Sequence, residues 1–322
     1  MNRPVPRSTR NAPSPFLIVV GLLAIVTALA VLAGYAGRWW WFADIIANFR
    51  PQLGVILVVC FVILLIGKWF RFALLMLLIA VVDLLPVGLL YRPAAGNPVT
   101  IGPDLRVVSF NLLSPNENYA EVISFLEDTE ADLVFLHEAS EPWEEALKES
   151  TLPYEVTSTR TDDQVFGTLV LAPVGAEVSP FSFAFDGERA VQVVLPWGDG
   201  SISLLGIHPL SPSTSIRAGL RDDQLAFAAD WASAQAGPVA VVGDFNASPW
   251  SHTFAAFREA GLMDSEQGFG LQLSFPVTSN LVLRVPIDHL LHSSDLAVLD
   301  RRLGPSLGSD HNSLIVDLAP AA

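Results

Sequence analysis

The N-terminal part of the chain contains three apolar stretches, each long enough to cross a lipid bilayer as a helix. They run roughly over Phe16–Ala36, Leu53–Phe70 and Phe72–Tyr91. About 20 consecutive apolar residues suffice for one helical span. The sequence therefore predicts a membrane anchor of three transmembrane helices over residues 1–91, with the membrane as an integral partner.

The first apolar stretch has an alternative interpretation as a secretory signal peptide, because Arg3, Arg7 and Arg10 precede it. Its apolar core is longer than the roughly 7–15 residues of a signal peptide, and two further stretches follow it. These features favour a retained anchor. Lys68 and Arg71 then divide the second stretch from the third, as in a tight hairpin of two spans with a basic turn.

The basic residues around these stretches predict an orientation. With three spans, five basic residues fall on the side of the N-terminus and of the Lys68–Arg71 turn, and three fall on the other side: Arg38, Arg50 and Arg92. Basic residues accumulate on the cytoplasmic side of membrane proteins. We therefore expect a multi-pass protein of the bacterial inner or plasma membrane, with a cytoplasmic N-terminus and the C-terminal domain outside the cytoplasm.

Charge divides the chain at the same place. Residues 1–100 hold eight Lys or Arg and two Asp, whereas the remainder holds ten Lys or Arg and 31 Asp or Glu, a net charge of −21. Duplex-DNA binding leaves a basic footprint that such a domain lacks. The charge therefore does not favour stable binding of duplex DNA. Cys60 is the only cysteine, so the chain has no internal disulfide framework.

The remainder of the chain alternates between strand and helix patterns. A Pro- and Gly-containing linker over residues 92–103 precedes a domain over residues 104–322, which begins with the buried-strand run "LRVVSFNLL". Helical spacing follows in "NYAEVISFLEDTE", and again around Gly219–Ala236 and Ser251–Ala260. The pattern predicts an α/β domain in which two sheets pack together beneath covering helices.

Polar residues occur where several of the predicted strands end, which is where α/β proteins place their sites. They are Asn111, Glu138, His208, Asp244 with Asn246, Asp288, and Asp310 with His311. Carboxylate oxygens such as those of Glu138 and Asp310 suit Mg²⁺, with Mn²⁺ or Ca²⁺ as alternatives, and a substrate phosphate completes the shell. A histidine paired with a carboxylate, as His311 with Asp288, serves as a general base or charge stabiliser.

Each residue also has an ordinary structural explanation. Asn111, Asp244 and Asn246 are common turn formers, and Glu138 could cap the helix that follows it. Independent turn residues rarely fall into this full order, which favours function. We expect the remaining histidines to be structural: His137, His252, His289 and His292.

The ordered set FN, HE, IH, GDFN, ID and SDH resembles the endonuclease/exonuclease/phosphatase superfamily, whose members include DNase I-like nucleases, inositol phosphatases and sphingomyelinases. The resemblance covers residues 105–318 and extends to a bacterial membrane-anchored subgroup. It implies a two-sheet, four-layer α/β sandwich (DNase I-like) and metal-dependent hydrolysis of phosphodiesters or phosphomonoesters.

The resemblance also implies roles for the residues. Glu138 and Asp310 would bind the metal with Asn111 close by, Asp244 and Asn246 would position water and phosphate, and Asp288 would pair with His311. His208 matches a second catalytic histidine, for which Asp186 and Glu188 are candidate partners. Asn111 and Asn246 are further candidate phosphate contacts.

The chain departs from the family pattern at two points. His137 stands where the family more often has Gln before the glutamate, and basic loops that grip duplex DNA are not evident. We therefore predict a membrane-anchored, divalent-metal-dependent phosphodiesterase whose substrate is open between nucleic acid, phospholipid and small phosphoesters. The alternative is a non-catalytic binding protein that keeps the fold.

Two further residues have open roles. Arg221 is a candidate contact for a substrate phosphate, although an arginine on a helix surface is the commoner situation. Asp83 lies inside the third apolar stretch, where a carboxylate is expensive and therefore suggests function. A protonated Asp83 bonded to a neighbouring helix is the simpler expectation.

Overall fold

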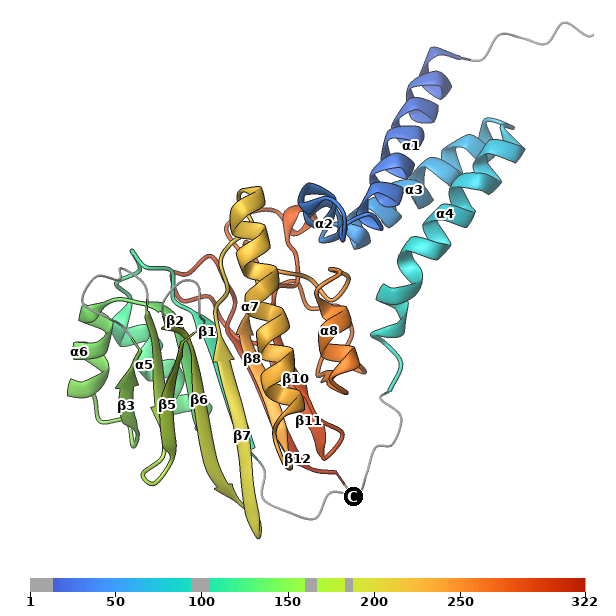
Figure 1. The fold of residues 1–322 in the computed structure, drawn as a ribbon. Helices are drawn as coiled ribbons and strands as arrows, with labels where there is room; N and C mark the ends of the chain where they lie inside the picture. Colours follow the sequence, from blue (N-terminus) through green and yellow to red (C-terminus); the bar gives the residue numbers. More distant parts are fainter. Residues whose placement is uncertain (1–13, 94–104, 160–166, 183–187, 322) are drawn as a thin grey trace, which may run out of the picture.

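The computed structural model describes residues 14–93, 105–159, 167–182 and 188–321 (Figure 1). Most of the predicted linker and residue 104 lie outside these ranges, as does Asp186. An N-terminal helical part projects away from a C-terminal α/β domain. The helical part therefore corresponds to the apolar N-terminal segment of the sequence, and the α/β domain corresponds to the acidic remainder.

The N-terminal part consists of four helices: α1 (Pro15–Gly34), α2 (Trp41–Ala47), α3 (Arg50–Ile66) and α4 (Phe70–Leu89). Helices α1 and α4 are each long and apolar enough to cross a membrane, and α2 with α3 form a third candidate that is bent by 66°. The structure thus offers two or three candidate spans. Large side chains such as Phe16 and Leu74 point outward, while small ones such as Ala24 and Ala80 allow the helices to pack closely.

The break between α3 and α4 falls at the predicted basic turn. Lys68 has a φ of 64°, a left-handed conformation that reverses the chain between Ile66 and Phe70. The turn lies at the end of the helices that is remote from the α/β domain (Figure 1). At the near end, Asp83 lies 3.5 Å from Arg50 Nε, and both side chains are buried. Asp83 therefore pairs with the neighbouring helix.

The α/β domain contains two six-stranded sheets with the strand orders β11-β12-β1-β2-β4-β3 and β5-β6-β7-β8-β10-β9. The strands of the first sheet are β1 (Leu105–Asn111), β2 (Leu133–Ala139), β3 (Glu155–Ser158), β4 (Gly167–Ala172), β11 (Leu296–Leu303) and β12 (Leu314–Pro320). Those of the second are β5 (Glu177–Ser182), β6 (Glu188–Trp197), β7 (Gly200–Ile207), β8 (Val239–Asp244), β9 (Met263–Asp264) and β10 (Asp288–His292).

The sheets pack face to face and helices cover both outer faces. Helices α5 (Tyr119–Thr129) and α6 (Glu141–Glu149) cover the first sheet, and α7 (Ser215–Ser233) and α8 (Phe254–Glu259) cover the second. Buried residues of both sheets form the central core, among them Phe135. This arrangement confirms the predicted four-layer, two-sheet α/β sandwich.

The topology brings the candidate site residues to one edge. Strands β1 and β2 run parallel in the first sheet, and β7 and β8 run parallel in the second. The carboxyl ends of these four strands carry Asn111, Glu138, His208 and Asp244. Because β10 is antiparallel to β8, with Asp288 opposite Asp244, it brings Asp288 to the same edge.

Candidate active site

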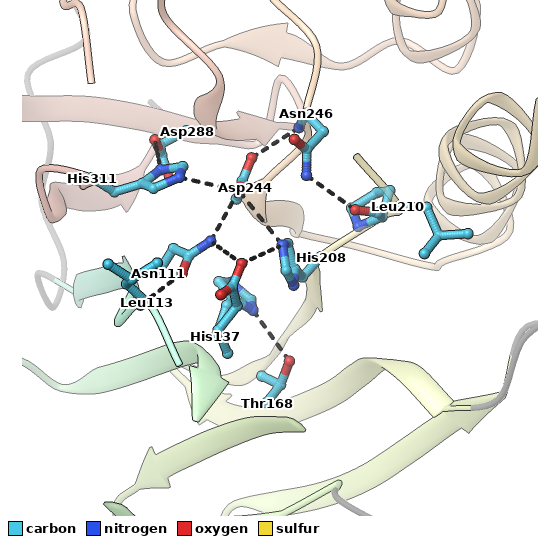
Figure 2. Close-up of polar contacts among 12 residues, drawn as sticks. Asn111, Leu113, His137, Thr168, His208, Leu210, Asp244, Asn246, Asp288 and His311 are labelled. Atoms are coloured by element: carbon cyan, nitrogen blue, oxygen red, sulfur yellow. Dashed lines mark hydrogen bonds and ion pairs between the residues drawn. The ribbon is translucent and has the colours of Figure 1, made fainter. Parts of the chain in front are cut away.

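Three of the predicted residues form a chain of contacts across the two sheets (Figure 2). The Asn111 amide donates from Nδ2 to Glu138 Oε1 at 3.0 Å and to Asp244 Oδ2 at 3.2 Å. The backbone of Leu113 donates to Asn111 Oδ1 at 3.0 Å, which fixes the amide so that its nitrogen faces the carboxylates. Asn111 therefore bridges two acids that belong to different sheets.

The backbone at Glu138 and at Gly243, which precedes Asp244, is held in a conformation that residues with side chains rarely adopt. Glu138 has a φ of 56°, and the pairing of β2 with β4 shifts register between Leu136 and Ala139. This irregularity turns the Glu138 carboxylate toward the site, and such strain is concentrated at functional positions. Gly243 has a φ of 146°, and a Cβ there would collide with the carbonyl oxygen of Ile207.

His208 joins this group from the end of β7. Its Nε2 lies 3.7 Å from Glu138 Oε1 and 3.6 Å from Asp244 Oδ2. The carboxylates beside it are therefore those of the site itself. Of the two expected partners, Asp186 lies outside the described residues and the side chain of Glu188 is not described.

His311 and Asp288 form the predicted imidazole–carboxylate pair. His311 Nδ1 donates to Asp288 Oδ2 at 2.9 Å, and the other ring nitrogen lies 3.6 Å from Asp244 Oδ2. The Phe275 ring covers the imidazole at a centroid distance of 4.5 Å. Burial opposes a charge on His311, but Asp288 and Asp244 outweigh it and raise the pKa of His311 to about 9.

The two buried aspartates differ in electrostatic state. Burial raises the pKa of Asp244, and the neighbouring Asp288 adds to this effect, although His311 and His208 oppose it. Burial also acts on Asp288, but the charge and hydrogen bond of His311 outweigh it and lower the pKa of Asp288. The site therefore holds one carboxylate committed to His311 and a second, Asp244, with a strengthened affinity for protons.

Asn246 and Asp310 lie at the border of the site. The backbone of Asn246 donates to Asp244 Oδ1 at 2.9 Å, and its Nδ2 donates to the carbonyl of Pro209 at 3.1 Å. The carbonyl oxygen of Asp310 accepts from the backbone of Val277 at 2.8 Å. The Asp310 carboxylate contributes to the raised pKa of His311.

The donor set fits a divalent cation. Asp244, Asp288 and His311 each offer a ligand atom, and these atoms lie within 4.8 Å of one another. Asp288 Oδ1 is buried without a hydrogen-bond partner among the described residues. The carboxylate oxygens of Asp244 and Asp288 suit Mg²⁺, Mn²⁺ or Ca²⁺, whereas His311, whose raised pKa keeps it protonated, would have to release a proton before it could act as a ligand. Among the described residues, this cluster does not include Glu138 or Asp310, so their joint metal binding stays a prediction.

Several supporting residues could not be identified from the sequence. Ser274 Oγ accepts from the backbone of Asp288 at 3.3 Å, and Ser309 Oγ donates to the Asn111 carbonyl at 2.6 Å. His137, expected to be structural, is fully buried between Ser109 and Thr168 at 3.4 and 3.2 Å, and burial lowers its pKa to about 3. Two of these residues lie in motifs that the sequence did reveal, Ser309 in SDH and His137 in HE, whereas no motif marks Ser274.

Arg221 has a different role from the predicted phosphate contact. Its side chain is 1% exposed and its Nη2 lies 2.8 Å from Oδ2 of Asp44, which belongs to α2. Nη1 donates to the carbonyl of Asn246 at 3.1 Å, and Asp222 Oδ1 accepts from Nε and also from Nη2. The guanidinium is therefore engaged with the protein and not with the open site.

Asp44 is held by a group of donors that we call the Asp44 socket: Arg221, Ser251 and His252. Ser251 Oγ donates to the carboxylate at 2.9 Å, and His252 donates from its backbone at 3.1 Å and from Nδ1 at 3.0 Å. Asn48 Oδ1 accepts from the backbone of Ser248 at 3.2 Å. These contacts attach α2 to the loop that follows Asn246.

Comparisons with known proteins agree with this fold. The profile of the Endonuclease/Exonuclease/phosphatase family matches residues 108–311. No curated protein sequence matches the chain. Humanized TDP2 of D. rerio is 17% identical at a TM-score of 0.58, with 67% of this chain and 98% of that chain covered.

Two bacterial structures are similarly related. The endonuclease/exonuclease/phosphatase from Bacteroides vulgatus is 14% identical at a TM-score of 0.55, covering 68% of this chain and 99% of that one. The 3′ phosphatase NExo from Neisseria, bound to a product DNA hairpin, is 16% identical at a TM-score of 0.53, covering 66% and 98%. The chain belongs to the Endonuclease/Exonuclease/phosphatase family, which confirms the resemblance found in the sequence motifs.

Proposed function

We propose that this family member is a membrane-anchored, divalent-metal-dependent phosphoesterase that hydrolyses a phosphodiester. The observation that carries the proposal is the convergence of Glu138, His208, Asp244 and His311 around one point at the edge of both sheets. A metal-dependent phosphoesterase activity is that of the family. The remaining question is what each residue of this chain does.

Asp244 is the best placed general base. It lies between the two imidazoles, at 3.6 Å from each, and its raised pKa makes it a better proton acceptor than an ordinary aspartate. The Asn246 backbone and the Asn111 amide hold its two oxygens in place. We assign it the activation of water, with Asn246 beside the substrate phosphate.

His311 is the best placed charge stabiliser. With a pKa of about 9 it carries a proton at neutral pH, so it donates to a phosphate oxygen more readily than it accepts a proton. Asp288 fixes the ring through Nδ1 and leaves Nε2 directed at the site. His208, opposite, is placed to donate to the same phosphate or to the leaving oxygen.

Glu138 is the best candidate for holding a Mg²⁺ or Mn²⁺ ion, with Asn111 adjacent and Asp310 at the border. When bound, the ion supplies positive charge that polarises the phosphoryl oxygen and stabilises the leaving oxyanion. The left-handed backbone at Glu138 keeps its carboxylate directed into the site before any ion arrives.

Substrate choice is open between three classes of phosphoester. TDP2 of D. rerio has been seen with a single-strand DNA product, and NExo with a DNA hairpin, which favours nucleic acid. The net charge of −21 over residues 101–322 opposes a polyanion and favours a lipid headgroup or a small phosphodiester. A membrane anchor formed by the candidate spans would keep the domain near lipid, which also supports a headgroup.

The test uses the full chain purified in detergent. Hydrolysis of a chromogenic phosphodiester, single- and double-stranded DNA, RNA and phospholipid is measured with Mg²⁺, Mn²⁺ or Ca²⁺ and after chelation. Asp244→Asn and His311→Gln should each lower the rate by about 10²–10⁴. The exposed Asp230→Asn is the matched control. Absence of metal-dependent turnover on every substrate leaves the non-catalytic alternative.

The proposed orientation has its own test. The N-terminus and the Lys68 turn would be cytoplasmic and the α/β domain would lie outside the cytoplasm, as the distribution of basic residues indicates. Protease added to spheroplasts should digest the α/β domain. Protection of the domain until the membrane is broken contradicts this orientation.

A further inference from the structure

A second polar cluster lies on the other side of β10 from the active site. It contains Asp264 at the end of β9, Glu266 just after it, and His289 in β10. His289 follows Asp288 directly, and successive side chains of a strand point to opposite faces of a sheet. The cluster is therefore separate from the Asp288–His311 pair although it shares a strand with it.

Each residue of this cluster has one buried polar atom without a hydrogen-bond partner among the described residues. These atoms are Asp264 Oδ2, Glu266 Oε2 and His289 Nδ1. One possible ligand atom from each of the three residues lies within 4.8 Å of the other two. Glu266 and His289 are 0% exposed. Buried polar atoms are nearly always satisfied, so three in one cluster require a common partner.

The other polar atoms of the same residues are engaged in a way that directs these three inward. His289 Nε2 donates to the carbonyl of Ala247 at 3.0 Å, which leaves a lone pair on Nδ1. Glu266 Oε1 accepts from the backbone of Gln272 at 2.6 Å, and Asp264 Oδ1 accepts from the backbone of Glu266 at 2.9 Å. A histidine with one nitrogen on a carbonyl is oriented as metal ligands are.

The nearest cation does not fill this role. Arg301 donates to Ser265 Oγ at 3.1 Å, to the Asp288 carbonyl at 3.2 Å and to Gln272 Oε1 at 2.5 Å. Its N–H groups are thus directed elsewhere, although its positive charge lowers the pKa of Glu266 and partly opposes the effect of burial. The remaining candidates for the common partner are a metal ion, a proton, since burial raises the pKa of Glu266 to about 7, and a buried water, which can donate to only two acceptors.

We propose that Asp264, Glu266 and His289 form a structural metal site for a divalent transition-metal ion, Zn²⁺ or Mn²⁺. Two carboxylates and one imidazole favour these ions over Mg²⁺ and Ca²⁺, which prefer oxygen alone. Metal–ligand distances of roughly 2.1 Å require each atom to move inward by less than about 1 Å. A proton satisfies two of the three atoms, whereas an ion satisfies all three.

The ion has a route of entry and a structural effect. Asp264 lines a cavity of about 900 Å³ that extends along α8 to the end of α4, so the cluster is reachable from that side. Bound metal would fix Asp264 and Glu266 on either side of Ser265. Ser265 holds Arg301, which in turn holds the Asp288 carbonyl. The site would thereby stiffen the strand that carries Asp288.

The test measures bound metal and not hydrolysis, so its outcome is independent of the proposed activity. The full chain in detergent, with Glu138→Gln to remove turnover, is stripped of metal, incubated with Zn²⁺ or Mn²⁺ and desalted. Metal per chain is then determined by mass spectrometry, together with the melting temperature. Glu266→Gln is compared with the exposed Glu259→Gln as the matched control.

We expect the control protein to retain one more equivalent of metal than Glu266→Gln, whose affinity should fall at least about 100-fold, because a ligand matters more than its supporting groups. Added metal should raise the melting temperature of the control only. His289→Gln is the second variant and should abolish nitrogen coupling to Mn²⁺ at this site by electron spin-echo spectroscopy. Equal metal content in all proteins, with no metal-dependent change in melting, overturns the proposal and leaves a shared proton or a buried water.

Discussion

The Asp44 socket and the candidate active site both bury carboxylates, yet they treat them in opposite ways. Asp44 accepts from Arg221, from Ser251 and twice from His252, so donors and positive charge surround it. Asp244 has one amide and one backbone donor and otherwise faces Asp288 and two imidazoles. A carboxylate with all its lone pairs occupied serves to hold the structure, whereas one with lone pairs directed into a site is available for chemistry.

The Asp44 socket also connects the helical part of the molecule to the α/β domain. The socket joins α2 to the loop directly after Asn246, and Arg221 contacts both Asp44 and the Asn246 carbonyl. The helical part is thus attached within a few residues of the site. The contrast predicts that substitutions in the Asp44 socket lower the stability more than the turnover rate. Substitutions in the candidate active site should lower the turnover rate more than the stability.

The largest expected effect is at Asp244. Asp244→Asn should reduce turnover by about 10²–10⁴ because the base is lost. It should leave the melting temperature unchanged or raise it, because a buried carboxylate beside Asp288 is removed. Steady-state kinetics and thermal unfolding of the same preparation check both. A large loss of stability would mean that Asp244, like Asp44, serves mainly to hold the structure.

Asp44→Ala is expected to give the opposite pattern. Removing one partner of a buried ion pair leaves Arg221 without its fully buried counterion, which destabilises by about 3–5 kcal/mol. Asp222 also forms an ion pair with the Arg221 guanidinium and would keep part of its charge compensated, so we expect the lower end of that range. Denaturant unfolding in detergent measures it. A loss of turnover larger than the loss of stability would assign the socket to catalysis.

The pH dependence of the socket follows from His252. Hydrogen bonds to Asp222 and Asp44 raise the pKa of His252 to about 9, above an unfolded value near ~6.5. A raised pKa stabilises the folded state fully below pH ~6.5, and this contribution is lost as the pH rises through about 9. The difference in melting temperature between the natural protein and His252→Gln should therefore shrink between pH ~6.5 and pH ~9. A difference that grows over this range contradicts the assignment.

The smallest effect is expected at the edge of the junction. Gln52 Nε2 donates to the carbonyl of Arg284 at 2.6 Å, a single contact between α3 and the α/β domain. Gln52→Ala should lower stability by about 1 kcal/mol and leave turnover unchanged. Thermal unfolding with a parallel rate measurement is sufficient. A change in rate would mean that even this remote contact controls the site.

Much of the fold could be predicted because its signals are local. The three apolar stretches, the helical spacing of residues 118–130 and the buried run before Gly243 each depend on neighbours in the sequence. Strands β5 and β11 had no such signal. Strand β11 carries Asp300, Arg301 and Arg302 within eight residues, which breaks the apolar alternation by which strands are recognised.

The sequence by itself identified the family and predicted the order of the site residues, because short motifs such as GDFN and SDH combine turn chemistry with reactive side chains at strand ends. Only the tertiary structure decided what Arg221 and His289 contact. Arg221 meets a carboxylate 177 positions away, and His289 meets Asp264 and Glu266 through the pairing of β9 with β10. Such contacts depend on the packing of distant segments, and no local pattern of residues records them.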